Sequence, residues 1–576
     1  MEFGLVVAWL ALYLGLGALA LPASSLVLGA LPDRGAGLAI PLSFAVLAFV
    51  GFWVGQVTFG PVTAVVAVLV LGALTVVAVR RGVTVHWNRY RDAAVVFGLS
   101  FALLIVIRAA DPAAYPGGGE KFLDFGLLAS LLRATHLPPQ DVWFAGEPVQ
   151  YYYGGHMLAA IFAHLTRTGA EYAYNLSLAG YYAAYTTAAF GLAGAISAGV
   201  GRSYRRGGAV AAFFVAIASN LSTPLRLLVW VLPEPLGARL ASVAGVEMAG
   251  LALGPFQFDY WLASRVVDAG AAGEWTHITE FPFFAFLNGD LHGHMMSPPI
   301  LLLGAAFALA YWRTSRVRRG RRGALLFGAI PPLVGLLLVV NTWSAPALVG
   351  IAWLTVLFAP APPWSLLPNR LVGAVDEWVS DSPIKTEGSR IVLATVFAVV
   401  VAALGAISVV PFLANSASSR AIDLFPEGPS PLAGLLLVHG AFLATTAGFL
   451  ARDRSRSDVA IAALLVVGAI ASTATMGYAA VGLFVPLLFG AWYGLRTSDR
   501  FDYETVLTVG ALGLLVLVEF VYVVEEAGPG RMNTVFKVSA QVWALWSVAA
   551  GAMVAGTPPV GRSVRHVGER LRTAVG

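Results

Sequence analysis

Two acidic residues and a lysine lie close together in a chain that otherwise carries little charge. Asp, Glu, Lys and Arg make up only 12% of the residues, yet Glu120, Lys121 and Asp124 are near neighbours in one loop. Spacings of three and four would put these side chains on one helix face. A carboxylate held beside a cation can act as a general base, although the same pattern fits a solvated charge pair at a helix start. We expect Asp124 to be the base and Glu120 to support it.

A tyrosine triplet follows in the same loop, at Tyr151, Tyr152 and Tyr153, and His156 comes shortly after it. Aromatic residues beside a membrane commonly form an interfacial belt. Successive helical positions are about 100° apart, however, so three consecutive tyrosines cannot all face the same way. Those that point inward need a partner for the hydroxyl. A ring face next to a hydroxyl also suits the recognition of a sugar.

A second loop gathers acidic and histidine side chains at Glu280, Asp290, His292 and His294. The Asp-x-His-x-His spacing could hold a divalent metal ion through Asp290, His292 and His294. All three would share a face on a strand but not on a helix. A hydrogen-bonded site for a phosphate or a sugar fits the same residues, and we favour it. No cofactor is certain from this pattern, and a divalent metal stays open.

A third polar segment precedes the last long apolar run. Arg531 and Lys537 flank Asn533 at its entrance. Arginine binds phosphate through two parallel hydrogen bonds and lysine binds it as a point charge. The alternative is a pair of cations whose heads reach the membrane surface while their stems stay in the apolar layer. We expect the three residues to contact a substrate.

Apolar runs of about 20 residues recur along the 576-residue chain, which is 58% hydrophobic and has a mean hydropathy of +0.78. Such runs are the length of bilayer-spanning helices, and the short alternating segments of a β-barrel are absent. We therefore predict an all-α bundle of about 13–16 transmembrane helices. The net charge of +5 comes mostly from arginine clusters in short loops, which indicates orientation in the membrane rather than nucleic-acid binding. The lack of cysteine excludes disulfides and thiolate chemistry.

The arginine-rich loops predict which segments face the cytoplasm. We expect N-terminal helices at 1–108, a core at 109–556 and a basic cytoplasmic tail at 557–576. The segments 109–150, 231–295, 412–430 and 524–536 would then be external, some of them with short amphipathic helices. All three polar segments fall on this one face, which favours a single composite site. The stretch 151–199 must cross an odd number of times, and we expect 151–166 not to be a full span.

The ordered set of motifs resembles the YYY membrane-protein family, an uncharacterised family that is itself similar to the GT-C glycosyltransferases. The resemblance rests on segments that together cover most of residues 115–545: Glu120, Lys121, Asp124 and Phe125; Trp143, Phe144 and Gly146; Tyr151, Tyr152, Tyr153 and His156; Glu280, Phe281 and Pro282; Asp290, His292 and His294; Asn341, Thr342 and Trp343; and the run from Arg531 to Lys537. It implies a GT-C-like membrane enzyme with a catalytic carboxylate in the first external loop and a polyprenyl-phosphate-linked sugar donor.

We therefore expect a multi-pass glycosyltransferase of the cell membrane that acts on the external face. Arg531 and Lys537 would hold the lipid phosphate, and the tyrosines with His292 and His294 would line a sugar pocket. The acceptor, whether glycan, lipid or protein, stays open. The alternative is a transporter or lipid-carrier flippase without transferase activity. Most predicted spans are clean runs of Ala, Val, Leu and Gly, whereas a transporter needs polar residues deep inside several spans.

Overall fold

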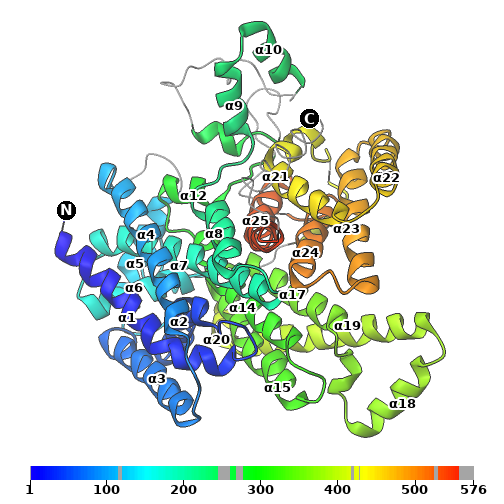
Figure 1. The fold of residues 1–576 in the computed structure, drawn as a ribbon. Coiled ribbons are helices and arrows are strands. Elements are labelled where there is room, and N and C mark those ends of the chain that lie inside the picture. The colour runs from blue at the N-terminus through cyan, green and yellow to red at the C-terminus, as the bar shows by residue number, and fades with distance from the viewer. Residues whose placement is uncertain are drawn as a thin grey trace, which may run out of the picture.

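The predicted all-α membrane fold is confirmed. The computed structural model describes residues 2–113, 120–243, 260–267, 277–416, 421–426, 428–524 and 530–556. Within these ranges the only sheet is one antiparallel pair, β1 (Ile422–Leu424) with β2 (Val521–Val523). All other regular elements there are helices, packed side by side (Figure 1). The predicted basic tail 557–576 lies outside the described residues, and the division at residue 108 stays a prediction.

Ten helical segments in the described part of the chain are long and apolar enough to cross a membrane. They contain α1 (Phe3–Val27), α2 (Ala39–Gly55), α3 (Pro61–Arg80), α4 (Trp87–Ala110), α14 (Pro298–Trp312), the continuous stretch Arg319–Phe358 with α15 (Arg319–Gly323), α16 (Ile330–Asn341) and α17 (Ala345–Phe358), then α19 (Pro383–Ile407), α21 (Leu432–Ala451), α22 (Arg456–Ala474) and α23 (Ala479–Thr497). The predicted number of 13–16 also counts helices outside this set. Three of them are the long helices α7 (Ala170–Gly199) and α25 (Met532–Val554) and the shorter α24 (Tyr503–Leu517). The upper number also counts 151–166 and 208–230 and takes the stretch Arg319–Phe358 as two spans.

Shorter helices connect or cover these spans. They are α5 (Lys121–Arg133), α6 (Gly154–Thr166), α8 (Tyr204–Ala216), α9 (Ser222–Val231), α10 (Glu234–Val243), α12 (Pro282–Asn288), α13 (Gly293–Met296), α18 (Asn369–Val379) and α20 (Val410–Asn415). Helix α6 has 13 residues. It therefore rises only about 20 Å, less than the roughly 30 Å of the hydrocarbon layer. This length supports the expectation that 151–166 is not a full span.

Helix α7 lies in the middle of the bundle, against α4, α8, α14 and α25. Its Ala- and Gly-rich sequence lets neighbouring backbones approach closely, as is common between membrane helices. A Cβ on Gly191 would lie only 2.6 Å from the carbonyl oxygen of Gly37. Close packing of this kind holds α7 against the short turn that precedes α2.

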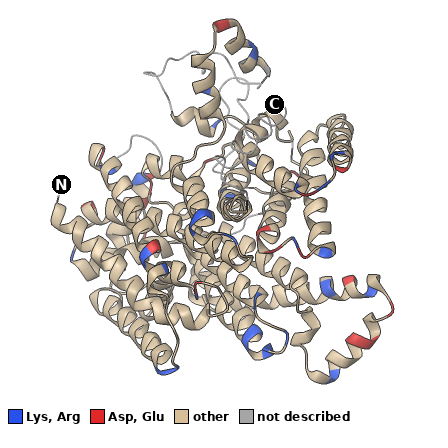
Figure 2. Cartoon of the chain, viewed as in Figure 1, with Lys and Arg blue, Asp and Glu red and all other residues tan. Residues whose placement is uncertain are grey.

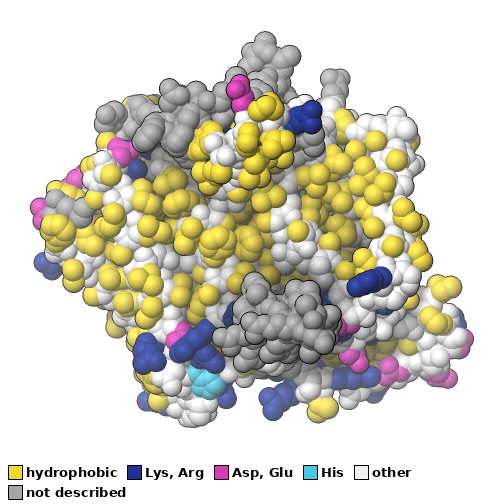
Figure 3. Space-filling model, turned by 45° about the horizontal axis from the view of Figure 1, so that its top comes forward, with side chains coloured by type: hydrophobic (Ala, Val, Ile, Leu, Met, Phe, Trp, Pro, Cys, Tyr) yellow, Lys and Arg dark blue, Asp and Glu magenta, His cyan; other side chains and the backbone are white. Residues whose placement is uncertain are grey.

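Charged residues are sparse within the helices and gather mainly at helix ends and in loops (Figure 2). The outer surface shows a broad band of hydrophobic side chains, with Lys and Arg side chains concentrated along one edge of it (Figure 3). An apolar band bounded by charge is the surface that a bilayer-spanning bundle presents to lipid.

Candidate functional site

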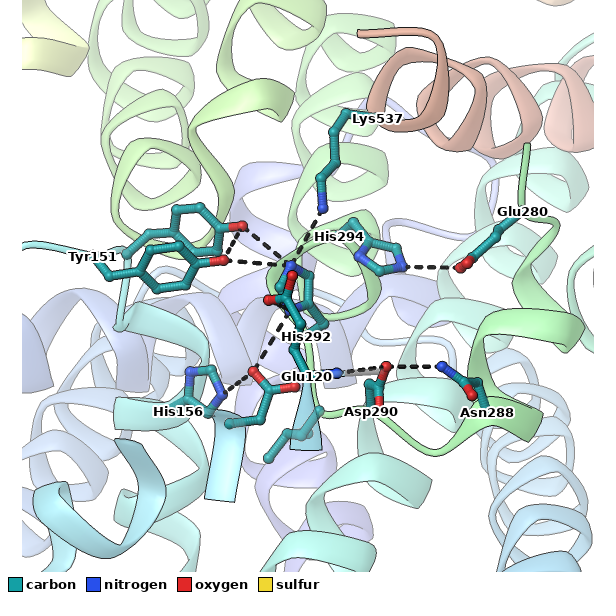
Figure 4. A network of polar contacts seen from close by, with 12 residues as sticks. Glu120, Tyr151, His156, Glu280, Asn288, Asp290, His292, His294 and Lys537 are labelled. Atoms are coloured by element: carbon teal, nitrogen blue, oxygen red, sulfur yellow. Dashed lines mark hydrogen bonds and ion pairs between the residues drawn. The ribbon is translucent and has the colours of Figure 1, made fainter. Parts of the chain in front are cut away.

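His292 is the centre of a polar cluster built from the three segments that the sequence singled out. Its Nδ1 lies 3.3 Å from Glu120 Oε2 and 3.6 Å from Asp124 Oδ1. His292 precedes the short helix α13 in extended backbone, with φ −96° and ψ 154°. Because the backbone is extended there, the ring leaves the helix and points at the start of α5 (Figure 4).

The other ring nitrogen of His292 faces three further polar groups. Its Nε2 lies 3.2 Å from the hydroxyl of Tyr152, 3.4 Å from that of Tyr151 and 3.3 Å from Lys537 Nζ. A lysine ammonium has only hydrogens to donate, so Nε2 must accept from it. We infer that Nδ1 carries the ring proton and directs it to the carboxylates. The imidazole thus links a cation on one side to two acids on the other.

Asp124 is completely buried one helical turn after Glu120. Its Oδ1 lies 3.2 Å from His156 Nε2, and both side chains have no exposed surface. This contact is within ion-pair distance but is not aligned as a hydrogen bond. Burial alone would raise the pKa of Asp124, but His156 and His292 outweigh it and lower the pKa to about 2. Asp124 is therefore a carboxylate at neutral pH.

Glu120 is the accessible acid of the cluster, since 59% of its side chain is exposed. It stands immediately before α5, and its carbonyl accepts a 3.1 Å hydrogen bond from the backbone N–H of Asp124. Glu120 and Asp124 thus both face His292 Nδ1, as their spacing of four predicts. Lys121, also on this turn, is buried and contributes positive charge beside Asp290.

A tight turn between α12 and α13 brings Asp290 to the start of α5. Asp290 Oδ2 accepts hydrogen bonds from Asn288 Nδ2 at 2.8 Å and from the backbone N–H of Glu120 at 3.4 Å. Gly289 has a left-handed φ of +79°, and a Cβ there would lie 2.7 Å from Arg108 Nη1. Burial, reinforced by the negative charge of Asp124, raises the pKa of Asp290 to about 7.

Glu280 and His294 form the edge of the cluster nearest α25. Glu280 Oε2 lies 3.5 Å from His294 Nε2. The His294 and Phe536 rings pack in a T-shaped arrangement, with their centroids 4.9 Å apart. Burial raises the pKa of Glu280 to about 7, although the positive charges of Arg265 and Lys537 lower it. A cavity of about 20 Å³ lies beside this pair, which is room for about one water molecule.

Replacing Glu280 by glutamine is expected to flatten the pH dependence of stability. Its pKa is raised from 4.5 to about 7, so the folded state holds the proton more tightly than the unfolded chain. This stabilisation is complete below about pH 4.5 and is lost as the pH rises through about 7. In the variant, the free energy of unfolding should therefore change by roughly 3 kcal/mol less over this pH range than in wild type. Thermal unfolding in detergent between pH 4 and 8 measures this change, and the exposed Glu147→Gln is the control. Equal slopes of stability against pH for wild type and Glu280→Gln would refute the expectation.

The three side chains considered as metal candidates, Asp290, His292 and His294, point to different partners. Asp290 turns to Asn288 and Glu120, while His292 turns to the other acids and His294 to Glu280. Among the described residues no group of three or more His, Asp or Glu side chains is arranged to hold a metal ion. These contacts fit the reading favoured from the sequence, a hydrogen-bonded site, and its ligand stays a prediction.

Arg531 belongs to a separate buried network and does not face the cluster as predicted. Its guanidinium donates to His277 Nε2 at 3.0 Å, to the carbonyl of Val518 at 2.7 Å and to Ser430 Oγ at 3.0 Å. Its Nη1 also lies 3.3 Å from Glu519 Oε1. Because the protein's own acceptors occupy the N–H groups of the guanidinium, Arg531 joins loops to one another. It has no pair of N–H donors left to bind a phosphate.

Two other predicted contact residues also stand apart from His292. Tyr153 caps the start of α6 and is buried, with its ring against Phe412 at a centroid distance of 5.9 Å. Asn533 is half-buried in the first turn of α25. Tyr151, Tyr152 and Tyr153 precede α6 and are not helical, so the helical argument for their directions does not apply, although Tyr152 and Tyr153 are buried as it expected for some of them.

Three residues that support the turn at Asp290 have no role in the site predicted from the sequence: Arg108, Tyr174 and Asn288. The Tyr174 hydroxyl accepts a 2.9 Å hydrogen bond from the backbone N–H of Leu291. Arg108 is buried at the end of α4, where its Nε donates to Asn175 Oδ1 at 2.9 Å. An arginine at the end of an apolar helix is a signal that could have identified Arg108, whereas nothing in the sequence distinguishes Tyr174 from the other four tyrosines of α7.

Comparison with known proteins agrees with a membrane protein and adds no named activity. No curated protein matches the chain. The match to a protein-family model covers residues 46–546, and that family is described as "Uncharacterized membrane protein (DUF2298)". Since these residues make up most of the 576-residue chain, the protein belongs to this uncharacterised membrane-protein family.

Proposed function

We propose that the protein is a membrane glycosyltransferase, which moves a sugar from a polyprenyl-phosphate-linked donor to an acceptor on the face that holds the His292 cluster. The observation that carries the proposal is the arrangement around His292, with two carboxylates at one ring nitrogen and Lys537 at the other. The resemblance to the YYY family and to GT-C glycosyltransferases supports the same chemistry. The family that the chain belongs to has no assigned activity, so the site itself is the main support.

Exposure favours Glu120, rather than Asp124, as the general base. An acceptor hydroxyl can approach the exposed carboxylate of Glu120, whereas Asp124 has no exposed surface. Asp124 would instead orient His292, which faces Glu120 from Nδ1. This assignment exchanges the roles expected from the sequence. Catalytic acids and bases must come within hydrogen-bond reach of the proton they move.

The proposed step is a displacement at the anomeric carbon of the donor sugar. The acceptor oxygen forms a bond to this carbon, its proton passes to Glu120, and the bond between the carbon and the phosphate oxygen breaks. Negative charge grows on the departing polyprenyl phosphate, and a fixed cation in a poorly solvated site stabilises such charge strongly. Lys537 is buried and lies 3.3 Å from His292 Nε2, which suits it to this role. Tyr151 and Tyr152 would contact the sugar with their ring faces and hydroxyls.

A transfer assay tests the proposal directly. The full chain in liposomes is given polyprenyl phosphates that carry different single sugars, and release of free polyprenyl phosphate is measured together with labelled product. We expect release above the background of protein-free liposomes, and its loss in His292→Ala. Release that is absent for every donor, combined with movement of solute or lipid carrier across the bilayer, would establish the transporter or flippase reading instead.

A further inference from the structure

A large cavity lies at the far ends of the helices that support the candidate site. Its volume is about 1060 Å³, and it is formed by the start of α4, the end of α7 and the start of α8. The opposite end of α4 carries Arg108, which contacts the turn at Gly289. Helix α4 has 24 residues, so the two regions are separated by about 36 Å along its axis. The cavity is therefore distinct from the His292 cluster.

The lining of this cavity is strongly basic. It contains four arginines, Arg89, Arg91, Arg202 and Arg205, and a single acid, Asp92. Asp92 is shared by two of them, since it lies 2.9 Å from Arg205 and 3.4 Å from Arg89. Arg202 pairs with the buried Glu504 at 3.1 Å. Positive charge at the opening therefore exceeds the negative charge that the lining supplies.

Arg91 is the arginine of the lining that forms none of these ion pairs. It is exposed, lines the cavity, and has no ion-pair or hydrogen-bond partner for its side chain among the described residues. Arg205 is also largely accessible, with 63% of its side chain exposed. Ser203 and Asn88 add neutral polar groups between the arginines. Convergent arginines with hydroxyl and amide groups match the oxygens of a phosphate.

The cavity opens at the level where an apolar helix leaves the membrane. Trp87 is the first residue of α4, lines the cavity and is 56% exposed. Tryptophan at the end of a spanning helix marks the depth of lipid headgroups. Figure 3 shows Lys and Arg side chains and a histidine gathered at the lower edge of the apolar band. Orientation in the membrane alone explains arginines in a loop, but it does not require that they line one hollow between three helices.

We propose that this cavity binds the phosphate of an anionic phospholipid headgroup. Basic pockets between transmembrane helices on the arginine-rich side are suited to such lipids. The cations meet the phosphate, and Trp87 with the adjoining helix surface meets the start of the acyl chains. A soluble phosphate has the same oxygens, and the experiment separates the two sources. The proposal does not depend on the function proposed for the His292 cluster.

Native mass spectrometry of the detergent-solubilised full chain tests this site. The protein is titrated with phosphatidylglycerol or with phosphatidylcholine of the same acyl chains, and separately with inorganic phosphate. Wild type should retain phosphatidylglycerol more tightly than phosphatidylcholine. Arg91→Gln together with Arg205→Gln should weaken retention of phosphatidylglycerol by about tenfold or more, because two charge-assisted contacts are lost. Arg454→Gln, an exposed arginine of a different loop, is the control and should bind as wild type does.

The outcomes distinguish the source of the phosphate. Selective retention of phosphatidylglycerol that inorganic phosphate does not displace supports the lipid site. Binding of inorganic phosphate alone, lost in the double variant, would overturn the lipid assignment in favour of a soluble ligand. Equal retention of both lipids, or equal binding by wild type and the double variant, would overturn the site itself. Transfer activity at His292 can be present or absent in each case.

Discussion

Replacing Glu120 by glutamine is expected to lower sugar transfer by about 10²–10⁴-fold, the loss that is typical when a general base is removed. The amide keeps the size of the side chain but cannot accept the proton of the acceptor hydroxyl. Because Glu120 is largely exposed, the variant should fold and insert normally. The measurement is turnover of a polyprenyl-phosphate sugar in liposomes at matched protein amounts.

Glu147→Gln is the matched control, since it removes an exposed carboxylate from the same loop outside the cluster. It should retain wild-type turnover. Asp124→Asn separates the two acids further. If Asp124 only orients His292, its loss should lower turnover less than the loss of Glu120. Wild-type turnover by Glu120→Gln, with strong loss in Asp124→Asn, would return the role of base to Asp124.

Replacing Lys537 by glutamine is expected to lower turnover by about 10²–10³-fold, comparable to the removal of one donor that stabilises developing negative charge. Lys537 is buried and contacts His292 Nε2, so no mobile surface cation can replace it. The change should appear mainly in kcat if the charge acts on the departing phosphate. An equal rise in KM would indicate binding of the donor instead.

Lys385→Gln provides the control, because Lys385 pairs with Asp381 on the surface of another helix. Lys537→Arg keeps the charge and should recover part of the activity. A Lys537→Gln enzyme with unchanged kcat and KM would show that the phosphate is held elsewhere. Arg108 is then the next candidate, because it lies beside the turn at Gly289.

Much of the cluster could be predicted because a membrane makes polar residues informative. Glu120, Asp124, His156, His292 and Lys537 stand out in a chain with 12% charged residues, and sidedness alone indicated that their loops share one face. Helix periodicity correctly related Glu120 to Asp124. The all-α class followed from apolar run length, which is the strongest sequence signal of a spanning helix.

Other features depend on contacts between distant segments and could not be read from local pattern. The sequence predicted Arg531 to bind a phosphate. In the structure His277 and Glu519 contact its guanidinium, and no sequence motif links either residue to Arg531. The hypothesis that Asp290 and His292 share a metal ion assumed that residues two apart in the sequence point to the same place. The turn at Gly289 instead sends the two side chains to different partners. Exposure, which favours Glu120 over Asp124, is likewise a property of packing alone.

The position of Lys537 in α25 has a consequence for how the protein is made. Helix α25 begins at Met532, 412 residues after Glu120, so its cation can reach His292 only after this helix has left the ribosome. A nascent chain that has inserted its earlier helices holds the carboxylates and the imidazole without their lysine. The cluster is therefore complete only after α25 has joined the bundle, and the transfer reaction proposed above could begin only then.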